Sequence, residues 1–165
     1  MTILQRDAAH FKSDEPEERR PGAENPYVEV DALSGSYVLI IRLDHDRVIE
    51  IGALGAIPLR AGAYAYVGSA MSGLDARIER HLRDDKRLHW HVDYLLQHAE
   101  IVDVVRVYTD RRLECRIAAP LCDRLPRVDG FGCSDCSCPS HLFGPERLSA
   151  LNETVDDVVE AVCLR

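Results

Sequence analysis

Short apolar runs rich in β-branched residues recur along the chain from residue 35 onwards. Runs of this length, bounded by turn residues, are typical of strands buried in a sheet. In the third run, the period of two places Tyr64, Tyr66 and Gly68 on one face. The predicted strands cover residues 37–41, 47–51, 62–68 and 101–108.

Apolar residues spaced three to four apart predict the helices. Leu74, Ile78 and Leu82 form the stripe of one helix, which begins near Ser72-Gly73. The remaining helices are predicted at residues 92–98, 113–121 and 148–164, and a loop rich in cysteine, glycine and proline at 130–144. This mixed order predicts an α+β fold, in which helices flank a small, largely antiparallel sheet and a Cys-rich loop precedes the last helix.

The N-terminal residues 1–33 contain little apolar periodicity and a highly charged run at residues 13–22. A segment of this composition cannot bury enough apolar surface to offset its ordering entropy, so we expect a disordered or loosely docked acidic extension. Residues 34–144 form the predicted domain and residues 145–165 a C-terminal helix. A chain of 165 residues fits one domain with tails.

No stretch of the sequence approaches the ~20 apolar residues that a membrane span needs, and the first residues are too polar for a signal peptide. We therefore expect a cytoplasmic protein without a membrane partner. Six cysteines in such a protein favour thiol, metal or redox chemistry over disulfides. The sequence indicates no oligomeric state.

The formal net charge of −8 would oppose binding to a polyanion if it were spread evenly. The acidic excess lies in the two tails, however. Residues 35–144 hold 15 acidic and 14 basic residues, so the body of the chain is nearly neutral. A local basic patch there can still contact phosphates, and the charge excludes no nucleic-acid function.

Two tripeptides frame the first and third predicted strands. Gly35-Ser36-Tyr37 opens one strand, and Tyr66-Val67-Gly68 closes the other. Arg77 follows nine residues after Gly68, and His81 follows four residues later in the predicted helix. Further motifs lie at residues 64–70, 89–96, 134–136 and 140–143.

This ordered set resembles the GIY-YIG nuclease superfamily. The resemblance is closest to a compact prokaryotic branch labelled domain of unknown function 123 or Uri-type endonuclease, and it covers residues 35–144. Ser36 and Val67 stand where the superfamily name has isoleucine. Both departures lie between the functional positions and leave those positions intact.

The resemblance implies a GIY-YIG-like fold and a metal-dependent endonuclease that hydrolyses phosphodiester bonds. Nucleic acid is the implied partner, with DNA expected first, and repair or defence is the expected context. One divalent ion, Mg²⁺ or Mn²⁺, is implied, with the carboxylate of Glu114 as its hard oxygen ligand. The implied catalytic residues are Tyr37, Tyr66, Arg77, His81 and Glu114.

Each implied role has a chemical reason. Arg77 presents a rigid fork of donors that suits the non-bridging oxygens of a phosphate. Tyr37 or Tyr66, close to Arg77 and the metal, is expected to have a lowered pKa and to help deprotonate a water. Arg77 and His81 lie one turn apart beside the buried stripe of their helix, so we expect both to line one cleft.

Three further residues are candidates for contact with the substrate. Gly68 has no Cβ, so we expect it to let the backbone approach the nucleic acid. His89 and His91 alternate just before a predicted helix, and either both point into the cleft or they cap that helix. Taken singly, strand tyrosines and helical arginines are mostly structural, and the functional interpretation depends on the ordered set.

The cysteine loop predicts a second metal site. Cys133, Cys136, Cys138 and His141 supply four thiol or imidazole groups within nine residues, a set that favours tetrahedral Zn²⁺. Because the Cys-x-Cys pair is short, Cys115 is an alternative ligand. The other interpretation is a reduced, metal-free cysteine cluster. We expect a structural zinc, separate from the catalytic ion.

Two other functions remain open at this point. One is a non-catalytic nucleic-acid-binding protein that keeps the fold without turnover. The other is a zinc-stabilised interaction module, in which the acidic tails and the cysteine loop matter and the tyrosines are structural. The intact set of Tyr37, Tyr66, Arg77 and Glu114 argues against the first of these two functions.

Overall fold

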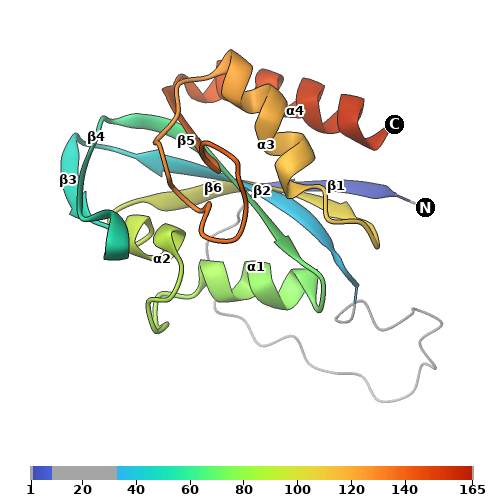
Figure 1. Ribbon diagram of the computed structural model, residues 1–165, viewed down its shortest axis with the longest axis horizontal. Helices are drawn as coiled ribbons and strands as arrows, with labels where there is room; N and C mark the ends of the chain where they lie inside the picture. The colour runs from blue at the N-terminus through green and yellow to red at the C-terminus, as the bar shows by residue number, and fades with distance from the viewer. Residues whose placement is uncertain (1, 9–32, 165) are drawn as a thin grey trace.

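The computed structural model describes residues 2–8 and 33–164, and within these ranges five strands form one sheet (Figure 1). The strand order is β1-β6-β2-β5-β7, and every neighbouring pair is antiparallel. The strands are β1 (Ile3–Ala8), β2 (Gly35–Leu43), β5 (Gly62–Ala70), β6 (Glu100–Tyr108) and β7 (Leu142–Glu146). A separate hairpin consists of β3 (Arg47–Glu50) and β4 (Ala56–Leu59), joined through the 3₁₀ helix η2 (Gly52–Leu54).

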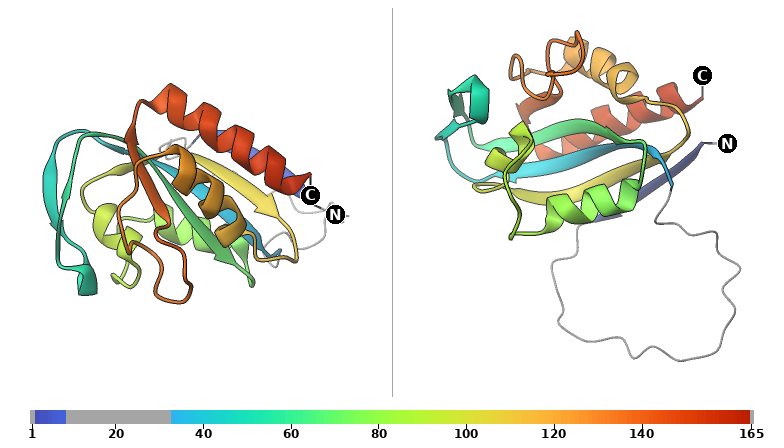
Figure 2. Two further views of the ribbon diagram at one scale, coloured as in Figure 1. Left: turned by 45° about the horizontal axis from the view of Figure 1, so that its top comes forward. Right: turned by 60° about the horizontal axis from the view of Figure 1, so that its bottom comes forward.

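Helices cover both faces of the five-stranded sheet. The first face carries α1 (Leu74–Leu82) and α2 (His91–Leu95), and the opposite face carries α3 (Glu114–Arg124) and α4 (Leu148–Cys163) (Figure 2). The predicted α+β class, with helices flanking a largely antiparallel sheet, is confirmed. None of the described helices is both long and apolar enough to cross a membrane.

Strand β2 lies in the middle of this layered arrangement. Tyr37, Leu39 and Ile41 belong to the core beneath α1 and α2, whereas Val38 and Ile40 belong to the core beneath α3 and α4. Both faces of the strand are therefore buried. This explains why the sequence shows an unbroken apolar run there and no alternation with polar residues.

Strand β1 differs from the sequence prediction, which placed residues 3–8 in the acidic extension. It forms an edge strand in which Ile3 pairs with Tyr108 and Ala8 with Asp103. Arg6 forms ion pairs with Asp103 of β6, at 2.6 Å, and with Asp156 of α4. Ladder hydrogen bonds and ion pairs hold a largely exposed strand, so apolar periodicity gave no sign of it. Residues 1 and 9–32 of the predicted extension lie outside the described residues.

The predicted loop at residues 130–144 also differs from the structure, because its end belongs to β7. Leu142 pairs with Tyr66 and Phe143 with Ala65, and both residues of β7 are fully buried. The strand contains Gly144-Pro145, and these residue types weaken the strand signal in a sequence. Strand β4, which contains Pro58, was not predicted for the same reason.

Helix α4 was predicted as a separate C-terminal element, yet it packs into the same core as α3 and β5. Leu151, Val155 and Val159 are fully buried there, next to Ile117 and Leu121 of α3. The residues of α4 and those of the predicted domain therefore form one structural unit.

This packing makes α4 essential for stability. We expect Leu151→Ala to lower the free energy of unfolding by about 2–5 kcal/mol, the usual cost of truncating a buried leucine. Leu148→Ala is the matched control, because Leu148 lies on the same helix and is 40% exposed. Urea unfolding measures both changes, and equal small effects would show that α4 is not part of the core.

Candidate functional site

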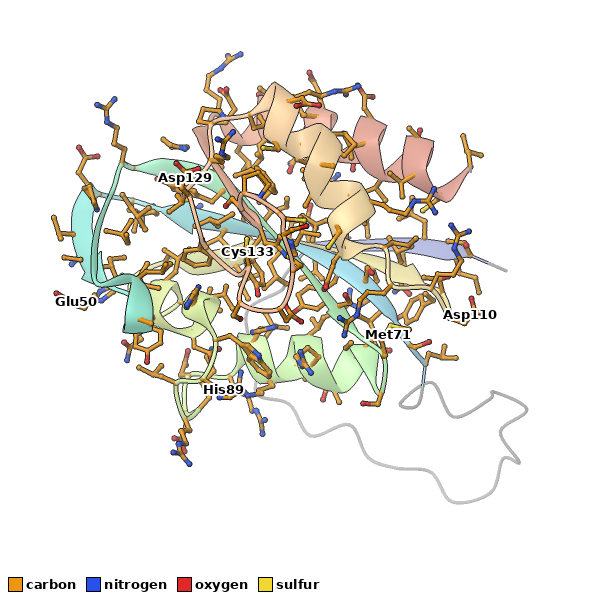
Figure 3. All side chains as sticks on the ribbon, viewed as in Figure 1. Glu50, Met71, His89, Asp110, Asp129 and Cys133 are labelled. Atoms are coloured by element: carbon orange, nitrogen blue, oxygen red, sulfur yellow. The ribbon has the colours of Figure 1, made fainter. Side chains whose placement is uncertain are left out.

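A cleft of about 560 Å³ opens at the end of the sheet where β2 begins and β5 ends. Side chains of β2, β5 and α1 line it, together with the first turns of α2 and α3 and the loop at residues 132–141. In Figure 3, His89 and Met71 mark two parts of its rim, and Cys133 marks the loop. The cleft thus gathers residues that lie far apart in the sequence.

The pairing of β2 with β5 places Tyr37 opposite Gly68. A Cβ at residue 68 would lie 2.5 Å from the Cζ and hydroxyl oxygen of Tyr37. Gly68 lines the cleft, and the direction in which a Cβ would point from its Cα is occupied by the Tyr37 ring. The structure gives this glycine a packing role, because without a Cβ at residue 68 the Tyr37 ring can lie across β5. The close approach of a substrate at Gly68 stays a prediction.

The hydroxyl of Tyr37 meets a buried histidine behind the cleft. Its oxygen lies 2.8 Å from His81 Nε2. His81 Nδ1 lies 3.8 Å from Asp93 Oδ1, and it has no hydrogen-bond partner among the described residues. The order along this line is tyrosine, histidine and carboxylate. His81 does not reach the cleft surface itself, so the expectation that it lines the cleft beside Arg77 is wrong.

Asp93 is held in place by several donors. Both of its carboxylate oxygens accept hydrogen bonds from Arg80, each at 3.0 Å. Its Oδ2 also accepts the backbone N–H groups of His89 and Trp90, at 2.9 and 3.0 Å. Burial raises the pKa of Asp93, but the neighbouring His81 ring and the hydrogen bonds from Arg80 and the two backbone groups outweigh burial and lower this pKa well below its usual range. The buried carboxylate therefore stays ionised next to His81.

The pKa values of the buried tyrosines and of His81 differ from the prediction that Tyr37 or Tyr66 has a lowered pKa. Burial raises the pKa of both Tyr37 and Tyr66 well above 10, although the charge and a hydrogen bond of Arg77 oppose the change at Tyr37. The predicted lowering is therefore wrong for both residues. Burial also lowers the pKa of His81 below 6.5, although Asp93 opposes it. At neutral pH the pair is a phenol and a neutral imidazole, with the Nδ1 proton of His81 favoured by the Asp93 carboxylate.

Arg77 lies on the cleft side of α1. Its guanidinium stacks on the ring of Trp90 at 4.3 Å, and its Nη1 lies 3.5 Å from the carbonyl oxygen of Ser69. Arg80 stacks on the same ring at 4.2 Å but is paired with Asp93. The two arginines therefore have different roles. Arg80 holds the buried carboxylate of Asp93, and Arg77 places a positive charge at the cleft.

Glu114 is the first residue of α3 and is only 8% exposed. Its Oε2 accepts a hydrogen bond from the hydroxyl of Ser69, and its Oε1 lies 3.8 Å from Arg112 Nη1. Along β5, Ser69 points to the face opposite Gly68, which is the face that carries α3. A carboxylate and a hydroxyl at a water-accessible cleft are hard oxygen donors, and they fit an ion such as Mg²⁺ that keeps several of its waters.

The two predicted substrate histidines both line the cleft. His91 begins α2, and its Nδ1 accepts the backbone N–H of Gly132 at 3.0 Å. In the neutral ring the proton must then reside on Nε2. Burial lowers the pKa of His91, so this neutral form is the relevant one. His89 is exposed, and its ring meets the edge of Trp90 at 5.0 Å.

Three cysteines and one histidine converge on the loop side of the cleft. The ligand atoms of Cys115, Cys136, Cys138 and His141 lie within 4.8 Å of one another, and Cys136 Sγ is 3.4 Å from His141 Nε2. This set is compatible with a structural zinc site. The first predicted set is corrected in one position: Cys133 is not a member, and Cys115, the alternative ligand, takes its place.

Cys133 has a different environment. Its thiol donates a hydrogen bond to the carbonyl oxygen of Phe131 at 3.2 Å, and burial raises its pKa to about 12. The exchange of Cys133 for Cys115 depends on how α3 packs against the loop. Local spacing in the sequence carries no information about that contact.

A protein-family model matches most of the chain. The family model described as Domain of unknown function DUF123 matches residues 36–164. The matched range includes the cleft residues and the cysteine–histidine cluster, and it continues through α4. No curated protein and no solved structure gives a significant match to the chain.

The close approach of Tyr37 to Gly68 gives a testable expectation. Gly68→Ala should cost about 1–3 kcal/mol of stability through overpacking, because the Tyr37 ring is buried and cannot withdraw. The double variant Gly68→Ala/Tyr37→Leu should cost less than the sum of the single changes. Chemical denaturation of the four proteins measures this coupling. Strictly additive costs would show that Gly68 does not serve the packing of Tyr37.

Proposed function

The chain belongs to the DUF123 family, and we propose that it is a metal-dependent endonuclease that hydrolyses phosphodiester bonds in nucleic acid. DNA is the proposed substrate. The resemblance of its tripeptides to those of GIY-YIG nucleases first suggested this activity. The observation that carries it is the convergence of Tyr37, Tyr66, Arg77 and Glu114 in one cleft, from the four elements β2, β5, α1 and α3.

Hydrolysis of a phosphodiester requires charge neutralisation at phosphorus, a deprotonated water and help for the leaving oxygen. The cleft offers a group for each requirement. Arg77 can engage the non-bridging phosphate oxygens through two parallel donors, and Arg112 adds a second cation at the cleft wall. These arginines supply a local basic patch within a body that is nearly neutral overall.

Glu114, with the Ser69 hydroxyl beside it, would hold the divalent ion, Mg²⁺ or Mn²⁺. Such an ion, when bound, would neutralise negative charge on the phosphate and on the leaving oxygen. The hydrogen bond from Ser69 fixes one carboxylate oxygen of Glu114. It thereby orients the ligand before any ion arrives.

Tyr37 and His81 form a proton relay in this proposal. The phenol is too weakly acidic to be ionised at rest, so it does not act as a preformed base. It can take a proton from the attacking water while it gives its own proton to His81 Nε2, 2.8 Å away. The imidazolium that results lies 3.8 Å from the ionised Asp93, which stabilises the new positive charge.

His91 is the donor that the cleft presents to the substrate. Because Gly132 occupies Nδ1, the proton on Nε2 is available to a phosphate oxygen or to the leaving oxygen. His89 and Trp90 form the neighbouring part of the rim, where the exposed imidazole of His89 can contact the nucleic-acid backbone. In this assignment both histidines bind substrate.

Removal of the charge at Glu114 tests the metal requirement. We expect Glu114→Gln to abolish Mg²⁺- or Mn²⁺-dependent cleavage of labelled oligonucleotides, because the amide keeps the shape but loses the affinity for a cation. The unfolding free energy should change little. Glu153→Gln, an exposed residue of α4, is the control and should cleave normally. Retained cleavage by Glu114→Gln would remove this residue from the proposed site.

The relay predicts a pH dependence with a definite sign. Neutral His81 accepts the proton, so the rate should fall as the pH falls through its lowered pKa, in a window below pH 6.5. The groups around the His81 ring that set this window are Tyr37, Tyr66, Arg77, Arg80 and Asp93.

The His81→Gln variant tests whether His81 is the group whose protonation causes the fall in rate at acidic pH, which is the acid limb of the pH–rate profile. We expect a rate loss of about 10²–10⁴-fold, typical of general-base removal, and loss of the fall in rate that the wild-type protein shows at acidic pH. Circular dichroism at each pH controls for unfolding. An unchanged acid limb in the folded variant would assign the titration to another group.

A further inference from the structure

Three cysteine thiols lie near the start of α3, next to the proposed metal ligand Glu114. The proposed hydrolysis does not use them. Cys115 follows Glu114 in the first turn of α3, and Cys136, Cys138 and His141 come from the loop that forms the cleft wall. We propose that these four residues bind one Zn²⁺ in a closed tetrahedral site that fastens the loop to the start of α3. Binding of this ion does not depend on the nuclease activity.

The distances between the donor atoms suit a single ion. Zinc bonds of about 2.3 Å to sulfur and about 2.0–2.1 Å to nitrogen place tetrahedral donors roughly 3.5–3.8 Å apart. Cys136 Sγ and His141 Nε2 are already 3.4 Å apart, and all four donors lie within 4.8 Å of one another. The widest separation needs to shorten by about 1 Å, which side-chain rotation can supply.

Two simpler explanations fit the cluster less well. A disulfide would use two of the three sulfurs and leave the third thiol and the imidazole without a purpose. A reduced, metal-free cluster would be held by weak sulfur hydrogen bonds such as the contact of Cys136 with His141 at 3.4 Å. One tetrahedral ion instead uses all three sulfurs and the ring nitrogen, which come from separate parts of the chain and converge within 4.8 Å.

Two backbone hydrogen bonds hold the histidine of the cluster in place. Its backbone N–H donates to Phe131 at 2.8 Å, and its backbone carbonyl accepts the N–H of Val67 at 2.9 Å. The histidine is thus anchored to β5, the strand that carries Tyr66 and Gly68.

The donor set selects the ion. Thiolates are soft ligands that select zinc over magnesium, whereas Glu114 and Ser69 offer hard oxygen. Three sulfurs and one nitrogen fill four positions, so no site remains for water, and the ion is structural. Its effect is to join α3, β5 and the loop, because the ligands come from α3 and the loop and His141 is anchored to β5.

The ligand set is tested by metal content. Protein purified without chelator should contain roughly one zinc per chain, measured by elemental analysis. Cys115→Ser and Cys138→Ser should each lower the zinc content severalfold. Cys133→Ser is the matched control, because it changes a neighbouring cysteine outside the cluster, and it should retain the wild-type zinc content. Loss of zinc in Cys133→Ser but not in Cys115→Ser would overturn the assignment.

Co²⁺ replacement keeps the test valid if a cysteine variant does not fold. The folded wild-type protein, reconstituted with Co²⁺, should show the strong visible bands of a tetrahedral ion and the sulfur-to-cobalt charge transfer of three thiolates. Added zinc should displace the cobalt and remove these bands. Weak octahedral bands, bound iron in place of zinc, or folded and reduced protein with well under one zinc per chain would each contradict the proposal.

Discussion

The antiparallel register of β2 and β5 is the constraint on which the site depends. It sets Tyr37 opposite Gly68, and the missing Cβ lets the phenol ring cross β5 so that its hydroxyl reaches His81. The next residue, Ser69, points to the other face of the sheet and meets Glu114. A shift of one residue would exchange the two faces and separate both contacts. One strand pairing therefore aligns the proposed proton relay with the proposed metal ligand, although they belong to different layers of the fold.

The two proposed metal centres lie close together in sequence and remain distinct in chemistry. Glu114 and Cys115 are consecutive, and consecutive side chains of a helix diverge by about 100°. One side chain meets Ser69 at the cleft, and the other joins Cys136 and Cys138 behind it. The hard oxygen of Glu114 prefers Mg²⁺ or Mn²⁺, whereas the soft sulfurs of the cysteines prefer Zn²⁺, so the two sites select different ions. The start of α3 is thus the point where the cleft and the cysteine loop are joined.

The sequence predicted the elements whose signal is local. Strands β2 and β5 and helix α1 follow from apolar runs and stripes. The ordered motif made Tyr37 and Glu114 candidates, and both line the cleft. Features that depend on distant packing were missed. Asp93 of α2 matters because it pairs with Arg80 of α1, and Cys115 replaces Cys133 because α3 reaches the loop. The predicted lowering of the tyrosine pKa was wrong. The motif indicates that an arginine lies nearby, but it does not indicate how deeply the phenol is buried, and burial has the larger effect on its pKa.

The central claim is that the cleft hydrolyses phosphodiesters through the hydroxyl of Tyr37. The most direct measurement compares wild type with Tyr37→Phe, which removes only that oxygen, on labelled single-stranded, duplex, flapped and abasic oligonucleotides with Mg²⁺ or Mn²⁺. The account predicts metal-dependent cleavage of at least one substrate by the wild-type protein and a loss of about 10²–10⁴-fold in the variant, with similar binding. Equal cleavage by the two proteins, or binding without cleavage by the wild type, would contradict it.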